Sequence, residues 1–210
     1  MKQWKKNKEK TIMRKKIALI LVAMMTLGFT GCGDKADSTT ENNQKVEETQ
    51  KEEVAKDATE LLSKVWATYG EDEKFAAIGG DMEHPVDNAP GVFDISKAED
   101  LDASLGFPQA NVSEIDDAAS IMHMMNANTF TGAAYHVTDA GNLDSLATAI
   151  KDNILARQWM CGFPDKLIVV QVGEDYLVTA FGNGEIMDNF LSKLQAQYSD
   201  AKILFEEVIR

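Results

Sequence analysis

Strands are the clearest feature of the hydrophobic pattern, and they lie in the C-terminal part of the chain. Residues 129–137 alternate well enough between apolar and polar types to predict a strand. Residues 166–172 are a continuous run rich in β-branched residues, which predicts an interior strand. After the turn pair Gly173-Glu174, residues 176–181 form its hairpin partner, and residues 202–209 predict the last strand.

Two helices fit between these strands. Apolar residues recur at three- to four-residue spacing over 142–160 and over 183–198, and Asn142 and Asn183 stand at the N-cap positions. Residues 129–209 therefore predict an α+β fold with the ferredoxin-like order β-α-β-β-α-β. Such a sheet is antiparallel and carries both helices on one face. Because the hairpin strands are apolar on both sides, we expect N-terminal helices to cover the other face.

The pattern is weaker before residue 129. Apolar spacing predicts a helix over 52–69, and residues 91–95 predict a short strand. A short helix over 96–105 would be capped by its first residue, a serine. Residues 111–125 also fit a helix, with a strand as the alternative for the second half of that segment.

The N-terminus has the layout of an exported protein. The basic residues Arg14, Lys15 and Lys16 precede an apolar run, and Thr30 and Gly31 then precede Cys32. The apolar run holds about 12 residues, too few for the roughly 20 of a membrane-spanning helix. Translation starts at either Met1 or Met13, since residues 1–12 form an unusual basic extension.

The segment around Cys32 resembles the lipobox of bacterial lipoproteins, with Phe29 where Leu is usual. The resemblance implies that diacylglycerol is attached to the Cys32 thiol and that the chain is cleaved before it, so that two acyl chains anchor the protein to membrane lipid. The alternative is ordinary secretion with cleavage elsewhere. We therefore expect a lipoprotein signal peptide over 1–31, a disordered polar tether over 32–51 and a single globular domain over 52–210.

Charge excludes one class of partner. Residues 1–31 hold 8 of the 21 Lys and Arg and 1 of the 34 Asp and Glu, so the chain from Cys32 onward has 13 basic and 33 acidic residues, a net charge of −20. Such a chain repels nucleic acid and attracts cations and basic partners. The plainer role of these charges is solubility. With Cys32 lipidated, Cys161 has no second cysteine with which to form a disulfide.

A family resemblance covers the C-terminal two-thirds of the chain. The segments that carry it are Met124-Met125, Ala133-Ala134-Tyr135, Ile154 with Arg157, Phe163-Pro164, and Tyr176 with Val178. They resemble the domain-of-unknown-function lipoproteins of anaerobic Gram-positive bacteria, some of which are labelled bacteriocin transport accessory protein. The resemblance implies an anchored extracytoplasmic domain and brings no catalytic residues with it.

Two sulfur-containing segments are candidates for chemistry. Cys161 invites a thiol-redox interpretation, but it follows a predicted helix C-terminus, where the dipole opposes a thiolate, and Pro164 stands where a C-x-x-C motif has its second cysteine. The run Met122-His123-Met124-Met125 contains ligands that suit a soft metal, but adjacent helical residues point apart. We expect core packing in both cases.

Polar candidates are equally weak. Asp81, Glu83, His84 and Asp87 form an oxygen-rich loop that lacks the order of a calcium-binding loop, so we expect a solvated acidic loop. His136 is expected on the sheet surface.

Arg157 is expected to pair with Asp152 or with the C-terminal carbonyls of its helix, and its alternative role is binding a carboxylate ligand. The sequence contains no G-x-S-x-G, no H-E-x-x-H and no phosphate-binding glycine loop.

These observations predict a non-enzymatic, membrane-anchored binding or transport-accessory domain on the extracytoplasmic side, with an envelope protein or transporter as its partner. No motif for a cofactor is present. The alternative is an envelope enzyme or metal-binding protein, which a pocket with a histidine and two or more convergent carboxylates would favour. We expect an exposed apolar groove near the loops of residues 70–110 or at a sheet edge formed by 166–172.

Overall fold

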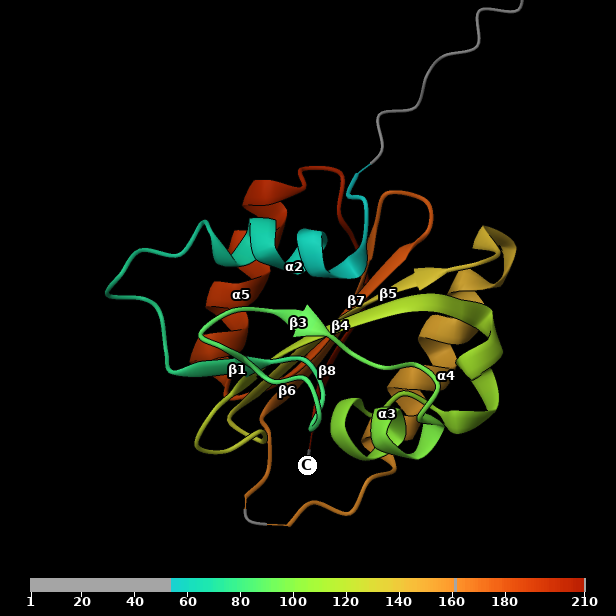
Figure 1. Ribbon diagram of the computed structural model, residues 1–210, viewed down its shortest axis with the longest axis horizontal. Helices are drawn as coiled ribbons and strands as arrows, with labels where there is room; N and C mark the ends of the chain where they lie inside the picture. The colour runs from blue at the N-terminus through green and yellow to red at the C-terminus, as the bar shows by residue number, and fades with distance from the viewer. Residues whose placement is uncertain (1–53, 161, 210) are drawn as a thin grey trace, which may run out of the picture. The chain divides into compact units, whose positions relative to one another are not determined.

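A computed structural model describes residues 54–160 and 162–209 (Figure 1). The expectations for the signal peptide, for Cys32, for the tether and for Cys161 fall outside these residues. None of the helices in the described ranges is both long and apolar enough to cross a membrane.

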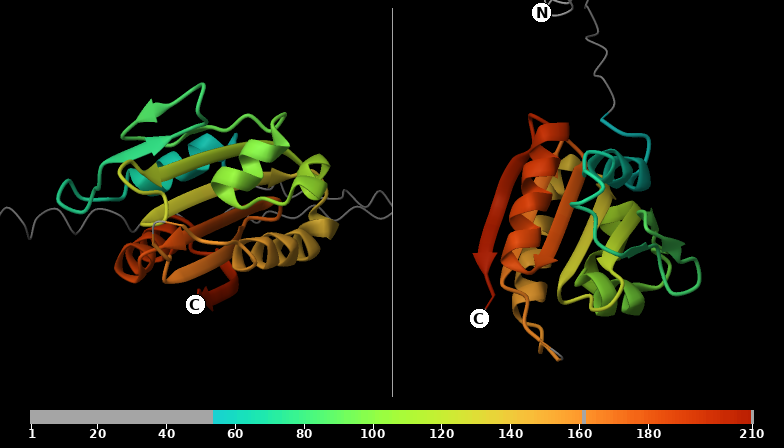
Figure 2. Two further views of the ribbon diagram at one scale, coloured as in Figure 1. Left: turned by 90° about the horizontal axis from the view of Figure 1, so that it is seen from below. Right: turned by 90° about the vertical axis from the view of Figure 1, so that its left-hand side faces the viewer.

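The architecture is an antiparallel sheet with helices on both faces (Figure 2). In the described part of the chain the strands are β1 (Ala77–Gly79), β2 (Val86–Asp87), β3 (Gly91–Val92), β4 (Ile115–His123), β5 (Phe130–Val137), β6 (Lys166–Val172), β7 (Tyr176–Gly182) and β8 (Lys202–Val208). The helices are α2 (Ala58–Trp66), α3 (Ala98–Leu105), α4 (Leu143–Leu155) and α5 (Gly184–Gln197), with 3-10 turns η1 (Gln109–Glu114) and η2 (Ala140–Asn142). The strand order is β2-β1-β4-β5-β7-β6-β8, and β3 pairs with β4.

The central strands supply apolar side chains to a core on each side of the sheet. In β6, Leu167 and Val169 pack in the core under α3 and α4, whereas Ile168 and Val170 pack in the core under α2 and α5. All four are essentially inaccessible to solvent. Alternate residues of a strand point to opposite faces, so a continuous apolar run needs a cover on both.

The positions of α4 and α5 follow from the handedness of the connections. α4 joins β5 to β6 and α5 joins β7 to β8, and each connection joins parallel strands with one strand between them. Both connections move in the same direction across the sheet, but β7 runs opposite to β5. Crossovers between parallel strands are almost always right-handed, so this reversal places the two helices on opposite faces.

The predicted α+β class, the antiparallel sheet and the element order β-α-β-β-α-β are confirmed, and the predicted strand 166–172 matches β6. The expectation that both helices lie on one face is wrong, because β8 pairs with β6 at the edge. The N-terminal helices are divided in the same way: α2 covers the α5 face and α3 covers the α4 face.

The predicted helix over 111–125 is wrong, and the strand alternative is correct. Ile115 and Ala118 pack in the α3–α4 core, whereas Ala119 and Ile121 pack in the α2–α5 core. A strand buried on both faces shows no polar–apolar alternation. Apolar residues in this segment also occur at three- to four-residue spacing, which predicted a helix.

The predicted caps had mixed outcomes. The Asn183 side chain caps α5 by accepting from the N–H of Glu185 at 3.1 Å. Asn142 makes no side-chain cap for α4, and α3 starts at Ala98 without a side-chain cap from Ser96.

Candidate functional site

A cleft of about 570 Å³ opens at the end of the sheet where the described chain begins. Its walls are the segment before α2, the start of β4, the end of β5 and the β6–β7 turn. The residues that line it are Val54, Ala55, Lys56, Asp57, Asp116, Asp117, His136, Gly173, Glu174, Asp175, Tyr176 and Asp200. Among these described residues six are acidic, and they face one lysine and one histidine.

His136 lies between two carboxylates in this cleft. Its Nδ1 is 2.5 Å from Asp116 Oδ1, and its Nε2 is 3.5 Å from Asp175 Oδ2. Its ring is tilted against Tyr176, with 5.0 Å between the ring centroids. The imidazole can donate to both carboxylates at once only when both nitrogens carry a proton.

A β-bulge sets this geometry. In the β4–β5 ladder Ile115 pairs with Val137 and Asp117 pairs with His136, so Asp116 is the extra residue of the bulge. A bulge changes the direction of a side chain, and here it leaves the Asp116 carboxylate beside the ring of His136. Asp117, directly opposite His136, instead accepts from the N–H of Ala58 at 2.6 Å at the start of α2.

The turn between β6 and β7 supplies the other carboxylate. Gly173 takes a φ of +62°, and a Cβ at this position would lie 2.6 Å from Cγ2 of Val54. The turn therefore depends on glycine both for its backbone conformation and for its close approach to Val54. The carbonyl of Asp175 accepts from the N–H of Val137 at 2.7 Å, which fixes the turn against β5.

The pKa of His136 is raised above its ordinary value of 6.5. Partial burial lowers this pKa, but the hydrogen bond and charge of Asp116, together with the charge of Asp175, outweigh the effect of burial. The cleft therefore favours the imidazolium form.

This cleft brings a histidine together with carboxylates, but these side chains do not converge on one position that a metal ion could occupy. The two carboxylates face different ring nitrogens. In the described ranges no group of three His, Cys, Asp or Glu side chains has the geometry to hold a metal ion. The arrangement is thus an ion-pair chain, and it does not favour the metal-site alternative.

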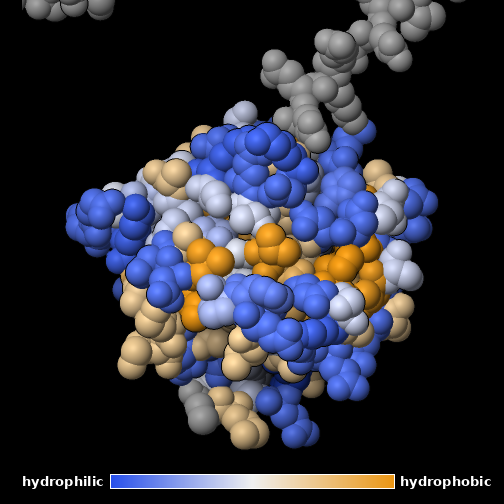
Figure 3. Space-filling view, in the orientation of Figure 1, coloured by the Kyte–Doolittle hydropathy of each residue, from blue (hydrophilic) through white to orange (hydrophobic). Residues whose placement is uncertain are grey.

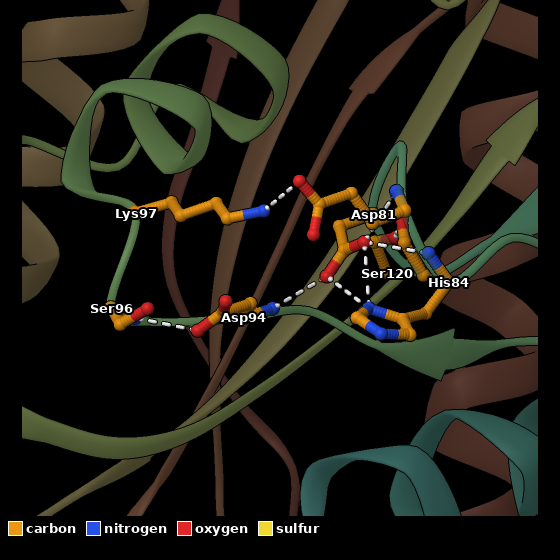
Figure 4. A network of polar contacts seen from close by, with 8 residues as sticks. Asp81, His84, Asp94, Ser96, Lys97 and Ser120 are labelled. Carbon is orange, nitrogen blue, oxygen red and sulfur yellow. Dashed lines mark hydrogen bonds and ion pairs between the residues drawn. The ribbon is translucent and has the colours of Figure 1, made fainter.

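The predicted acidic loop is a structural network (Figure 4). Asp81 is only 7% exposed. Its Oδ1 accepts from the N–H groups of Glu83 and His84, both at 2.8 Å, and its Oδ2 accepts from the N–H of Asp94 at 3.1 Å. His84 Nδ1 lies 3.1 Å from the same Oδ1. These contacts tie the chain after β1 to the chain after β3.

The other acidic residues of this loop turn elsewhere. The Glu83 carboxylate pairs with Lys97 Nζ at 2.6 Å, and Asp87 is exposed in β2. The four residues therefore do not converge, and the oxygens of Asp81 already serve backbone N–H groups.

Burial raises the pKa of Asp81, but the N–H donors of His84, Glu83 and Asp94 and the His84 ring lower it from 3.8 to about 2.

The expected apolar surface near residues 70–110 consists of three exposed side chains and a small pocket. Met82 is 90% exposed, Val92 is 58% exposed and Val86 is 39% exposed. The neighbouring pocket of about 250 Å³ is lined by Ile78, Gly79, Gly80, Asp81, Met82, Pro85, Phe93, Ser104 and Met122. Figure 3 shows apolar side chains across the middle of this face and a hydrophilic surface above them. The expectation of a sheet edge at 166–172 is wrong, because β6 lies between β7 and β8.

The residues of the methionine run point to different places. Met122 packs against the α3–α4 core, and the ring of His123 stacks on Phe75 with 5.4 Å between the ring centroids. Met124 and Met125 are exposed, so the expectation of core packing is wrong for these two residues. The side chains of these four residues therefore do not converge on one metal ion.

Arg157 does not pair with Asp152, whose carboxylate contacts Lys151 Nζ at 2.6 Å. Its Nη2 donates to the carbonyl of Ala103 at 2.5 Å, and its guanidinium carbon lies 5.1 Å from the centre of the Trp159 ring. Burial lowers the pKa of Arg157. In this structure Arg157 links α4 to α3.

Comparison of the chain with protein-family models, with curated proteins and with solved structures gave no match. The lipoprotein resemblance therefore remains an expectation from the sequence.

Replacement of Asp81 by Asn tests the loop network. The amide has only one accepting oxygen, so a buried N–H loses its partner, and we expect the free energy of unfolding to fall by about 1–3 kcal/mol at pH 7. Because the pKa of Asp81 is lowered from 3.8 to about 2, its contribution is present above pH 3.8 and is lost as the pH falls toward 2. Urea denaturation at several pH values measures this difference. Asp87→Asn, in exposed β2, is the matched control and should change little.

Replacement of His136 by Asn tests the ion-pair chain. Since the pKa of His136 is higher in the fold than its ordinary 6.5, its contribution to stability is complete below that pH and is lost as the pH rises through the raised pKa. We expect His136→Asn to destabilise the protein more at pH 5.5 than at pH 9, as measured by urea denaturation. Asp116→Asn should show the same pH dependence. A loss that is independent of pH for both variants would contradict the pairing.

Proposed function

We propose that this protein is a lipid-anchored, extracytoplasmic binding domain, and that the cleft around His136 recognises a cationic group of its partner. The observation that carries the proposal is the charge of the cleft. When His136 is protonated, the described residues that line the cleft carry six negative and two positive charges. A concave surface lined by one sign of charge raises the local concentration of the opposite charge.

The contacts indicate which carboxylates would meet the ligand. Asp57 caps α2 by accepting from the N–H of Glu60, and Asp117 accepts from Ala58, so these two serve the fold. Asp116 and Asp175 share the charge of His136. Asp200 is exposed at the rim of the cleft. An ammonium or guanidinium group would thus be bound between the β6–β7 turn and the loop before β8.

The chemistry of the lining supports binding over catalysis. Both ring nitrogens of His136 face carboxylates, and the described lining residues contain no serine, threonine or cysteine that it could activate. A lysine or arginine side chain of an envelope protein has the charge that this surface favours. The extracytoplasmic location is supported by the pattern of residues 14–32.

Mass spectrometry of the native protein tests the anchor. We expect the purified chain to begin at Cys32 and to carry the added mass of a diacylglycerol group on its thiol. Cys32→Ser should abolish both the added mass and the release of residues 1–31. An unmodified Cys32 with the leader still attached would contradict the location.

Titration of the full-length protein in detergent with a tetralysine peptide tests the cleft. We expect saturable binding that weakens with salt, and Asp200→Asn and Asp175→Asn should each weaken it about two- to fivefold, since an exposed ion pair contributes about 0.4–1 kcal/mol. Tetraglutamate should not bind. Glu99→Gln removes one exposed charge from α3, outside the cleft lining, and should bind like the wild type. Equal weakening by Glu99→Gln would mean that the whole acidic surface, and not the cleft, attracts the peptide.

A further inference from the structure

Among the strands of residues 54–160 and 162–209, β8 is the outer one and pairs along one side only. It pairs with β6 on its inner side and ends the strand order, and Figure 2 shows it at the margin of the sheet. None of its residues from Lys202 to Val208 is buried. An edge of this kind presents backbone N–H and C=O groups to another strand.

The pairing with β6 shows which face each β8 residue occupies. Directly paired residues of antiparallel strands lie on the same face. Lys202 pairs with Gln171, Phe205 with Val169 and Glu207 with Leu167, which places them on the α4 face.

The remaining partners lie on the other face. Ile203 pairs with Val170 and Glu206 with Ile168, which places them on the α5 face. Val208 follows by alternation.

A β-bulge interrupts the alternation of β8. Val169 pairs with Phe205 and the next residue, Val170, pairs with Ile203, so Leu204 is the extra residue. Both Leu204 and Phe205 pack against the core on the α4 face. The strand therefore has two consecutive residues on one face, and this irregularity restricts how β8 can pair with a second strand.

Two copies of β8 can pair antiparallel about a two-fold axis perpendicular to the sheet. Such an axis places the α4 faces of both copies on one side of the joined sheet and the α5 faces on the other. Two residues can therefore oppose each other only if both lie on the same face. Given the bulge, one register satisfies this for all of residues 202–207. It opposes Lys202 to Glu207 of the second copy, Ile203 to Glu206 of the second copy, and Leu204 to Phe205 of the second copy.

This register is also complementary in charge. At its centre two Leu204–Phe205 pairs bring apolar side chains together, and at each end Lys202 meets Glu207 of the other copy. Glu206 already contacts Lys166 Nζ at 3.0 Å within its own chain. Among the ion pairs of the described ranges, none uses Lys202 or Glu207, so both are available across the two-fold axis.

We propose that the protein forms a two-fold symmetric dimer through antiparallel pairing of β8, which joins the two sheets and is fixed in register by Lys202–Glu207 pairs. This inference does not depend on the proposed function, because β8 contributes no residue to the lining of the cleft. Bulges and charged residues on an edge strand also serve to prevent pairing. That role predicts a monomer, so the two interpretations are separable.

Sedimentation equilibrium of the full-length protein in detergent, with the detergent density-matched, tests the dimer. We expect a species of twice the protein mass. Lys202→Glu and Glu207→Lys each place two like-charge pairs across the interface, and we expect each to raise the dimer dissociation constant at least about tenfold.

Mixing the two variants is the decisive measurement. One chain then presents two glutamates and the other two lysines, so both end pairs become attractive and the mixed dimer should form as well as the wild type. This recovery also shows that the variants are folded. A wild-type monomer at all concentrations, a dimer that neither substitution weakens, or a mixture that stays monomeric would each overturn the proposal.

Discussion

The structure depends on one constraint: the central strands are apolar on both sides, and both sides must be removed from water. Leu167 and Ile168 are neighbours in β6, yet they are buried in different cores. A single layer of helices would leave one of these cores open to solvent. In the described part of the chain, the consequence is that α2 and α5 cover one face and α3 and α4 cover the other.

The same constraint places the polar chemistry at the ends of the strands. Side chains in the middle of β5 and β7 are committed to packing, so the charged residues gather where the strands enter and leave the sheet. His136 is the next-to-last residue of β5, Asp116 lies in the bulge near the start of β4, and Asp175 precedes β7. The bulge at Asp116 and the turn at Asp175 thus meet the end of β5 at one end of the sheet, and they place two carboxylates beside His136.

Features that depend on neighbouring residues were predictable from sequence, and features that depend on long-range pairing were not. The bounds of β6 followed from a continuous apolar run, and the cap of α5 followed from Asn183. The positions of α4 and α5 on opposite faces depend on which edge of the sheet β8 joins. No local sequence pattern indicates that edge.

The segment of β4 was predicted as a helix because a strand that is buried on both faces, with alanines at its centre, lacks polar–apolar alternation.

The cleft was missed for a related reason. Asp116 and His136 are 20 residues apart, and only the β4–β5 register with its bulge brings the two side chains together. Asp116 and Asp117 lie in the segment 111–125, whose apolar spacing predicted a helix. A helix there would not pair with the strand that carries His136. A correct strand assignment alone would not have indicated the site, because the pairing of Asp117 with His136 and the bulge at Asp116 depend on the β4–β5 register.

One wall of the cleft is the segment by which the domain is joined to the rest of the chain. Lys64 Nζ donates to the carbonyl of Val54 at 3.2 Å, and the Tyr176 hydroxyl donates to the carbonyl of Ala55 at 3.2 Å. The first bond ties this stem of the domain to α2, and the second ties it to the start of β7. Tension transmitted along the backbone into Val54 would therefore reach this wall of the cleft before the rest of the described fold. Under the proposed function, a load on this stem and a ligand in the cleft would therefore act on the same segment.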